Sequence, residues 1–179
     1  TVAPDTIVVK PQPKLTLDYF LTEEIIGDDA FTQTVEPPMP YTLGVRIKNN
    51  GYGPASKVKI ESAQPKIVDN EQGLAIGFKI IESYLDDRPS EPTLLIDFGD
   101  IESQGVATGR WVMETSLSGR YTSFAASFTH ADELGGQLTS LLDATYSHFL
   151  LRDVRVDLNG RDNIKDYLAW NGDDLFVYE

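Results

Sequence analysis

The chain of 179 residues contains no cysteine, only two histidines and no long apolar run. The absence of cysteine excludes disulfide bonds, cysteine nucleophiles and thiolate metal ligands. No stretch approaches the roughly 18 apolar residues that a membrane helix needs, so we expect no direct membrane insertion. Basic residues are scarce too, because 15 Lys and Arg stand against 28 Asp and Glu, giving a net charge of −13. This charge repels phosphate backbones, so nucleic acid is not an expected partner.

The sequence does contain repeated short stretches in which apolar and polar residues alternate. Alternation of this kind is typical of half-buried β-strands, and no segment before residue 130 carries a sustained helical stripe. The strands are expected around Leu15–Leu21, Tyr41–Ile47, Lys57–Ile60, Leu74–Ile80, Leu94–Phe98, Trp111–Met113 and Phe124–Phe128. Their spacing predicts an all-β fold, an Ig-like antiparallel β-sandwich. The turn cluster Asn49–Pro54 is expected to join its two strands as a β-hairpin or as a crossing between sheets.

The chain is expected to divide into three segments. Residues 1–14 carry three prolines and predict a linker or edge segment, and residues 15–132 predict the sandwich. Residues 133–179 predict a small C-terminal extension, either packed on the sandwich or starting a next module. We expect it to hold a strand over His148–Leu158 with a bulge near Arg152, a short helical turn over Asn163–Ala169, and a last strand over Leu175–Tyr178. Because the first residue is not Met, we expect the chain to be a piece of a longer protein.

Catalytic motifs are scarce. No Gly-x-Ser-x-Gly elbow or P-loop occurs, and paired carboxylates of a glycosidase have no spacing that would single them out. His130, with Asp132 and Glu133 beside it, and His148 would have to converge for a metal-dependent hydrolase. Structural roles for both histidines are the favoured interpretation.

Paired aspartates in predicted loops raise the question of calcium. Calcium takes six to eight hard oxygen ligands, which such pairs supply, although no EF-hand pattern is present. The candidate ligands are Asp28, Asp29, Asp86, Asp87, Asp97 and Asp100, and a further pair lies at Asp173-Asp174. No cofactor follows with certainty, and we expect most of these aspartates to be solvated surface.

Exposed aromatic rings provide the candidates for a carbohydrate site. Tyr52 lies in a turn and Trp170 lies beside one, so these two rings are the candidate ligand-binding residues, whereas Trp111 lies among apolar neighbours and is expected in the core.

Several stretches together resemble a known family. Val45-Arg46-Ile47-Lys48-Asn49-Asn50-Gly51-Tyr52-Gly53-Pro54-Ala55, followed by Val58 and Ile60, resembles the strand–turn–strand signature of bacterial Ig-like modules of the CARDB type. The stretches Ser62–Leu74, Asp97–Ile101, Gly109–Trp111 and Gly160–Ile164 are similar to regions of very large modular bacterial surface or secreted proteins. The resemblance runs from about Lys14 to Glu179. It implies a β-sandwich related to adhesion and carries no catalytic residues.

The sequence leaves three hypotheses about function. The leading hypothesis is a non-catalytic structural or adhesion module of a large extracellular or cell-surface protein, acting as a spacer or interaction domain. Its partners would be neighbouring modules of the same polypeptide and a surface protein or polysaccharide. The alternatives are a carbohydrate-binding module of a secreted enzyme or adhesin and, behind it, a metal-dependent hydrolase.

Overall fold

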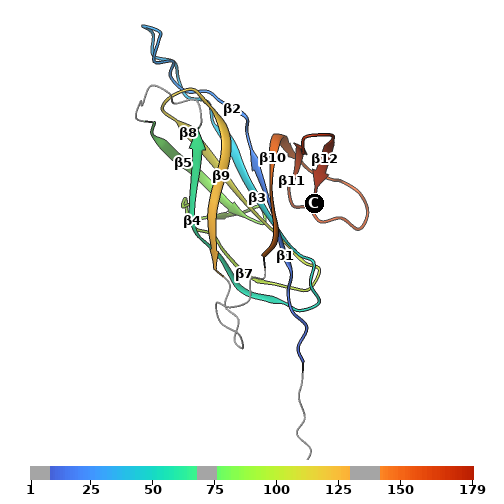
Figure 1. Ribbon diagram of the computed structural model, residues 1–179. Coiled ribbons are helices and arrows are strands. Elements are labelled where there is room, and N and C mark those ends of the chain that lie inside the picture. Colours follow the sequence, from blue (N-terminus) through green and yellow to red (C-terminus); the bar gives the residue numbers. More distant parts are fainter. Residues whose placement is uncertain (1–8, 68–75, 130–141) are drawn as a thin grey trace, which may run out of the picture.

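The alternating segments form strands arranged in two sheets (Figure 1). This computed structural model describes residues 9–67, 76–129 and 142–179. The larger sheet contains eight described strands in the spatial order β12 (Leu175–Tyr178), β11 (Asp166–Trp170), β10 (Leu142–Val154), β1 (Leu15–Leu21), β3 (Tyr41–Asn49), β8 (Val106–Thr115), β5 (Phe78–Leu85) and β6 (Arg88–Ser90). The smaller sheet contains β2 (Glu24–Ile25), β9 (Gly119–Thr129), β4 (Ala55–Ile67) and β7 (Asp97–Ile101). The all-β prediction is confirmed: the described residues contain no helix, and so none that could span a membrane.

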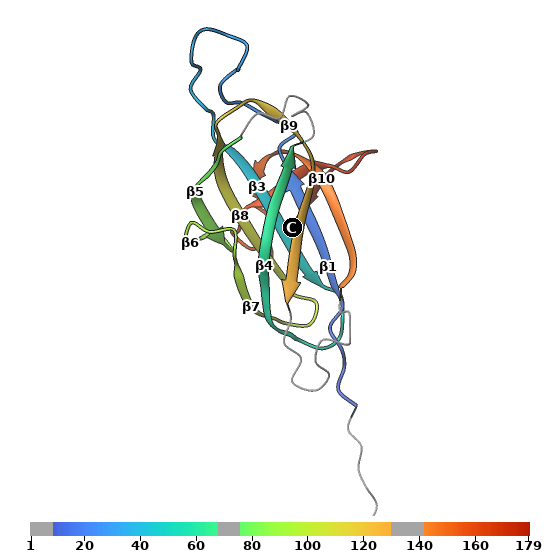
Figure 2. The same ribbon diagram turned by 60° about the vertical axis from the view of Figure 1, so that its left-hand side comes forward.

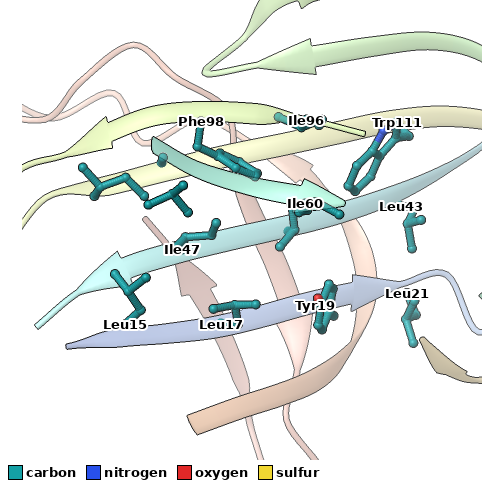
Figure 3. Close-up of a cluster of buried hydrophobic side chains, with 14 of the residues drawn as sticks. Leu15, Leu17, Tyr19, Leu21, Leu43, Ile47, Ile60, Ile96, Phe98 and Trp111 are labelled. Carbon is teal, nitrogen blue, oxygen red and sulfur yellow. The ribbon is translucent and has the colours of Figure 1, made fainter. Parts of the chain in front are cut away.

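The core lies between the two sheets. Alternate residues of β1 point inward, where they meet side chains from β3 and β8 of the same sheet. Residues of β4 and residues in and just before β7 close the core from the smaller sheet, as Figure 3 shows for Ile60, Ile96 and Phe98. Trp111, expected in the core, is fully buried there. Burying one such large apolar side chain contributes about 1.5–3 kcal/mol, so this shared interior holds the sheets face to face in a sandwich-like arrangement.

The turn between β3 and β4 carries the chain from one sheet to the other, which is the second of the two predicted alternatives. It is organised by Asn49, whose side chain is fully buried. The Oδ1 atom of Asn49 accepts hydrogen bonds from the backbone N–H groups of Lys14 and Gly51, both at 3.0 Å. Its amide donates to the carbonyls of Gly53, Ile101 and Glu102 at 2.8–3.2 Å. One buried amide therefore ties the entry segment, this crossing and the end of β7 together.

The glycines of this turn leave room for the entry segment. A Cβ atom at Gly53 would lie 2.0 Å from the carbonyl oxygen of Pro11, and one at Gly51 would lie 2.5 Å from that of Gln12. Only glycine permits so close an approach of two backbones. Residues 11–14, expected as a linker or edge segment, are thus packed against the crossing.

All described strand pairs within residues 15–132, the predicted sandwich, are antiparallel, but the first strand of the C-terminal extension pairs in the other direction. β1 and β10 run parallel, in a register from Leu15 opposite Leu142 to Leu21 opposite Phe149. Parallel strands need a long connection, and the chain between β1 and β10 contains the other strands of the sandwich. β10 has its bulge between Leu150 and Arg152, next to the predicted position, but ends at Val154 rather than at Leu158.

The helical turn expected over Asn163–Ala169 is wrong as well. Asp166–Trp170 forms strand β11, which pairs with β10 on one side and with β12 on the other. Tyr167 and Ala169 are buried on one face of this strand. The helical spacing of the apolar residues was overruled by these strand pairings, because backbone bonds to two neighbours and a buried face outweigh a weak local propensity.

The C-terminal strands β11 and β12 belong to the larger sheet but fold over the outer face of its strands β3 and β8, the face turned away from the core. Figures 1 and 2 show the C-terminal hairpin on the side of the larger sheet away from β4 and β9. Tyr167 packs there onto Gly44 of β3, and its hydroxyl donates to the carbonyl of Gly109 at 2.8 Å. A small second apolar cluster forms around this contact from Phe20, Leu150, Tyr167, Ala169 and Tyr178.

Candidate functional site

Asp86 and Asp87 form the two-residue turn between β5 and β6. Both have positive φ angles, 46° and 60°, as a type I′ hairpin turn requires. Asp86 accepts a hydrogen bond from the backbone N–H of Thr108 at 2.8 Å, and Asp87 accepts one from the backbone N–H of Lys165, also at 2.8 Å. The two carboxylates therefore brace this turn against β8 and against the C-terminal segment.

The other four candidate calcium ligands lie at two further places. Between β2 and β3, Asp28 accepts from the backbone N–H of Glu36 and Asp29 from that of Phe31. At β7, Asp97 accepts from the N–H of Gly99, which lowers the pKa of Asp97, and Asp100 accepts from the N–H of Lys57. The segment with Asp28 and Asp29 projects from one end of the molecule (Figure 2).

The structure thus distributes these aspartates over three separate places, namely two connections and strand β7. Among the described residues, no group of three or more His, Asp or Glu side chains is placed to hold a metal ion. The calcium site stays a prediction.

His148 lies in a buried polar cluster on the outer face of the larger sheet. Its Nε2 atom lies 2.8 Å from Oδ1 of Asp18, and its Nδ1 atom lies 3.2 Å from the hydroxyl of Tyr178. Arg46 donates to the other oxygen of Asp18 at 2.9 Å, and the His148 ring stacks on Phe20. Only 8% of His148 is exposed.

This cluster can anchor the C-terminal strands but offers little for hydrolysis. A catalytic His–Asp pair needs a nucleophile at the second ring nitrogen, and here the hydroxyl of Tyr178 occupies that place. His130, the other candidate of the hydrolase hypothesis, lies outside the described residues.

A second ionic cluster joins β8 to β10. The guanidinium of Arg110 lies 4.1 Å from the ring centre of Tyr84 and forms ion pairs with Asp87 at 3.3 Å and Asp153 at 3.5 Å. Burial raises the pKa of Asp153 in spite of this arginine. Since the arginine side chain is only 9% exposed, this buried cluster ties the end of β10 to β8.

The exposed aromatic ring of Trp170 lies beside an open depression. The depression has a volume of about 590 Å³ and is lined by Trp170, Asp173, Asp174, Leu175 and Phe176. Trp170 is 40% exposed. The side chain of Asn171 accepts hydrogen bonds from the backbone N–H groups of both aspartates, each at 3.0 Å, which fixes the turn between β11 and β12.

The carboxylates of Asp173 and Asp174 form no ion pair or hydrogen bond within the described part of the chain. They are therefore available to a ligand that donates hydrogen bonds or carries positive charge.

Tyr52, the other predicted ligand-binding ring, is 84% exposed on the crossing between β3 and β4. It belongs to a different element from Trp170, and the structure records no contact between the two rings among those it describes. Of the two predicted rings, Trp170 is the one that lines a depression formed by described residues.

Comparison with known proteins adds no relative. No protein-family model matches the chain, and no curated protein or solved structure matches it either. Any functional assignment therefore rests on the residues themselves.

Sequence reasoning missed the polar cluster, and it named Trp170, the pair Asp173-Asp174 and the last strand separately without predicting that they line one depression. Asp18 carried a weak signal, because it interrupts an otherwise apolar strand in which Phe20 follows at the same face. Nothing in the local sequence connects Asp18 with His148, which lies 130 residues away. Leu175 and Phe176 were placed correctly in a strand, but their exposure depends on which strands cover them.

Proposed function

We propose that the chain is a non-catalytic interaction module with an Ig-like β-sandwich fold, belonging to a large extracellular or cell-surface protein of the CARDB-like bacterial type. Its role is that of a spacer or adhesion domain, in contact with neighbouring modules and with a surface protein or polysaccharide. The two facing sheets with a shared core support the fold, and the resemblance over Val45–Ala55 supports the family.

The observation that carries this proposal is the contrast between two groups of side chains. The His148–Asp18 pair is enclosed and fully engaged, whereas Trp170, Leu175 and Phe176 are open to solvent at 40%, 55% and 47%. Exposed apolar groups beside unpaired carboxylates are typical of binding surfaces. These exposed side chains of the described surface are thus suited to binding a ligand.

The test combines a search for turnover with a search for binding. The purified chain is assayed on peptide, ester and glycoside substrates with and without zinc. In a separate experiment it is immobilised on beads, which are incubated with glycan arrays and peptide arrays. We expect no turnover and saturable binding to one class of array. Turnover that disappears in His148→Gln, or the absence of binding to both arrays, would contradict the proposal.

A carbohydrate is the second candidate, favoured by the geometry at Trp170. An exposed indole ring offers a flat apolar surface to a sugar ring, and the carboxylates of Asp173 and Asp174 accept hydrogen bonds from hydroxyl groups. Retention on insoluble polysaccharide that is lost in Trp170→Ala and kept in Tyr52→Ala would support it. Because Trp111 is fully buried, quenching of tryptophan fluorescence by a soluble glycan reports on Trp170.

A further inference from the structure

Strand β12 forms one edge of the larger sheet, and no described strand pairs with its outer side. Its four residues are Leu175, Phe176, Val177 and Tyr178, without proline or a charged side chain. The first three are 44–55% exposed. An apolar edge of this kind is a ready template for pairing with another strand.

The other described edges carry the features that prevent such pairing. β6 is only three residues long and contains an arginine and a proline. β7 carries two aspartates, a glycine with a φ of 66° and irregular pairing with β4. β2 has two residues. β12 is also short, with four residues, but it alone among these four described edges carries no charged residue, no proline and no irregular pairing, which suggests that its edge is used.

The direction of the backbone groups on β12 follows from its pairing with β11. The N–H of Asn171 donates to the carbonyl of Asp174, in the same register that sets Trp170 opposite Leu175. Bonding alternates along an antiparallel pair, so the N–H and C=O groups of Leu175 and Val177 point away from β11. They face outward and are available to a strand that adds to the edge.

The charges around this edge define the added strand. The depression with Trp170 and the unpaired carboxylates of Asp173 and Asp174 lies at the start of β12. A lysine or arginine fits there, with its aliphatic part against the indole and its cation near the carboxylates. A second copy of the chain is disfavoured, because each chain carries a net charge of −13 and a symmetric antiparallel pair centred on Phe176 sets Asp173 opposite Glu179.

We propose that β12 binds an extended peptide segment of another protein by strand addition, and that a basic side chain of this segment occupies the depression at Trp170. The inference rests on the proposed function as an interaction module and specifies its partner. The main-chain groups of Leu175 and Val177 supply affinity, and Asp173 and Asp174 select the basic residue.

A library of random short peptides displayed on phage tests the proposal. Enriched sequences are expected to alternate β-branched or aromatic residues with others and to carry lysine or arginine at one end. Synthetic copies are then titrated while the fluorescence of Trp170 is followed. Replacing their basic residue with glutamine weakens binding, as does raising the salt concentration.

Substitutions at Val177 separate strand addition from other binding. Val177→Pro removes an outward N–H without removing a bond to β11 and is expected to weaken peptide binding about tenfold or more. Val177→Thr keeps the N–H and is the matched control. If Val177→Pro disturbs the hairpin, seen as a changed Trp170 emission in the unbound chain, Val177→Lys replaces it, because a lysine on the edge repels a basic peptide while keeping the backbone intact.

Each result has a defined meaning. Weaker binding to the edge variant, together with loss of the basic preference in Asp173→Asn/Asp174→Asn, supports the proposal. Enriched peptides that bind the edge variant equally well overturn it. Binding of a glycan that depends on Trp170 but not on the edge variant also overturns it and leaves the interaction module standing. A chain that binds neither glycans nor peptides contradicts both proposals.

Discussion

Gly44→Ala tests how the C-terminal strands are held on the sandwich. A Cβ atom at this position of β3 would lie 2.5 Å from Cε1 and 2.7 Å from Cζ of Tyr167. Carbon atoms in contact prefer about 3.5–4.0 Å, so the ring has to move by roughly 1 Å. The ring is 1% exposed and has no room to move without displacing its neighbours.

The expected cost has two parts. Overpacking a filled interior costs about 1–3 kcal/mol. Displacing the ring also weakens the 2.8 Å hydrogen bond from its hydroxyl to the carbonyl of Gly109, which contributes about 1 kcal/mol. We therefore expect the free energy of unfolding to fall by about 2–4 kcal/mol, which lowers the melting temperature of a chain of this size by roughly 4–15 °C.

Urea denaturation of four variants measures this cost in a double-mutant cycle. Tyr167→Leu removes the ring atoms that the new methyl group would meet, so Gly44→Ala should cost almost nothing in that background. Gly77→Ala is the control, because its Cβ would meet only the Ser116 side chain at 3.6 Å, and we expect a change within about 0.5 kcal/mol. An equal cost of Gly44→Ala with and without Tyr167 would refute the reasoning.

Three further predictions concern buried polar groups. Asn49→Ala leaves several backbone groups of the crossing without a hydrogen bond and should lower the free energy of unfolding, measured by urea denaturation, by about 3 kcal/mol. Asn50→Ala loses one exposed hydrogen bond to Thr16 and should lower it by less than about 0.5 kcal/mol. Similar values for the two variants would contradict this prediction. Asp18→Asn leaves the buried guanidinium of Arg46 without a carboxylate and should lower the free energy of unfolding by about 3 kcal/mol in the same assay. A decrease of less than about 0.5 kcal/mol would count against this prediction. Burial raises the pKa of Asp153, so the folded state favours its protonated form, and its contribution to stability falls as the pH rises from below its ordinary pKa of 3.8 through the raised value. Asp153→Asn removes this pH dependence. As the pH rises through this window, the melting temperature of the variant should therefore increase relative to that of the wild type. A difference between the two melting temperatures that does not change with pH would contradict the prediction.

The sequence predicted those strands in which one face is buried by the sandwich itself. In β1 and β3 apolar residues recur at every second position on the face that packs against the smaller sheet, whereas in β8 this pattern covers only Trp111 and Met113. The all-β class and the core position of Trp111 follow from this alternation.

The prediction failed where a contact distant in sequence decides the structure. Tyr167 belongs to a segment whose apolar spacing suits a helix, yet its ring is buried against Gly44 and Gly109, which lie far away along the chain. The cluster around His148 escaped notice for the same reason. Its partners Asp18, Arg46 and Tyr178 come from three strands that only the folded sheet brings together.

The parallel pairing of β1 with β10 determines how the chain responds to mechanical load. A force that pulls the start of β1 away from the end of β10 acts along both strands, so the seven residue pairs between them are sheared together rather than opened one at a time. A force applied at the end of β12 reaches β12 and β11 before it reaches the pair of β1 and β10. These two strands are held on the sandwich through the ring of Tyr167. The C-terminal hairpin would then yield first under tension, and its release would remove the proposed binding edge at β12 while the sandwich stays folded.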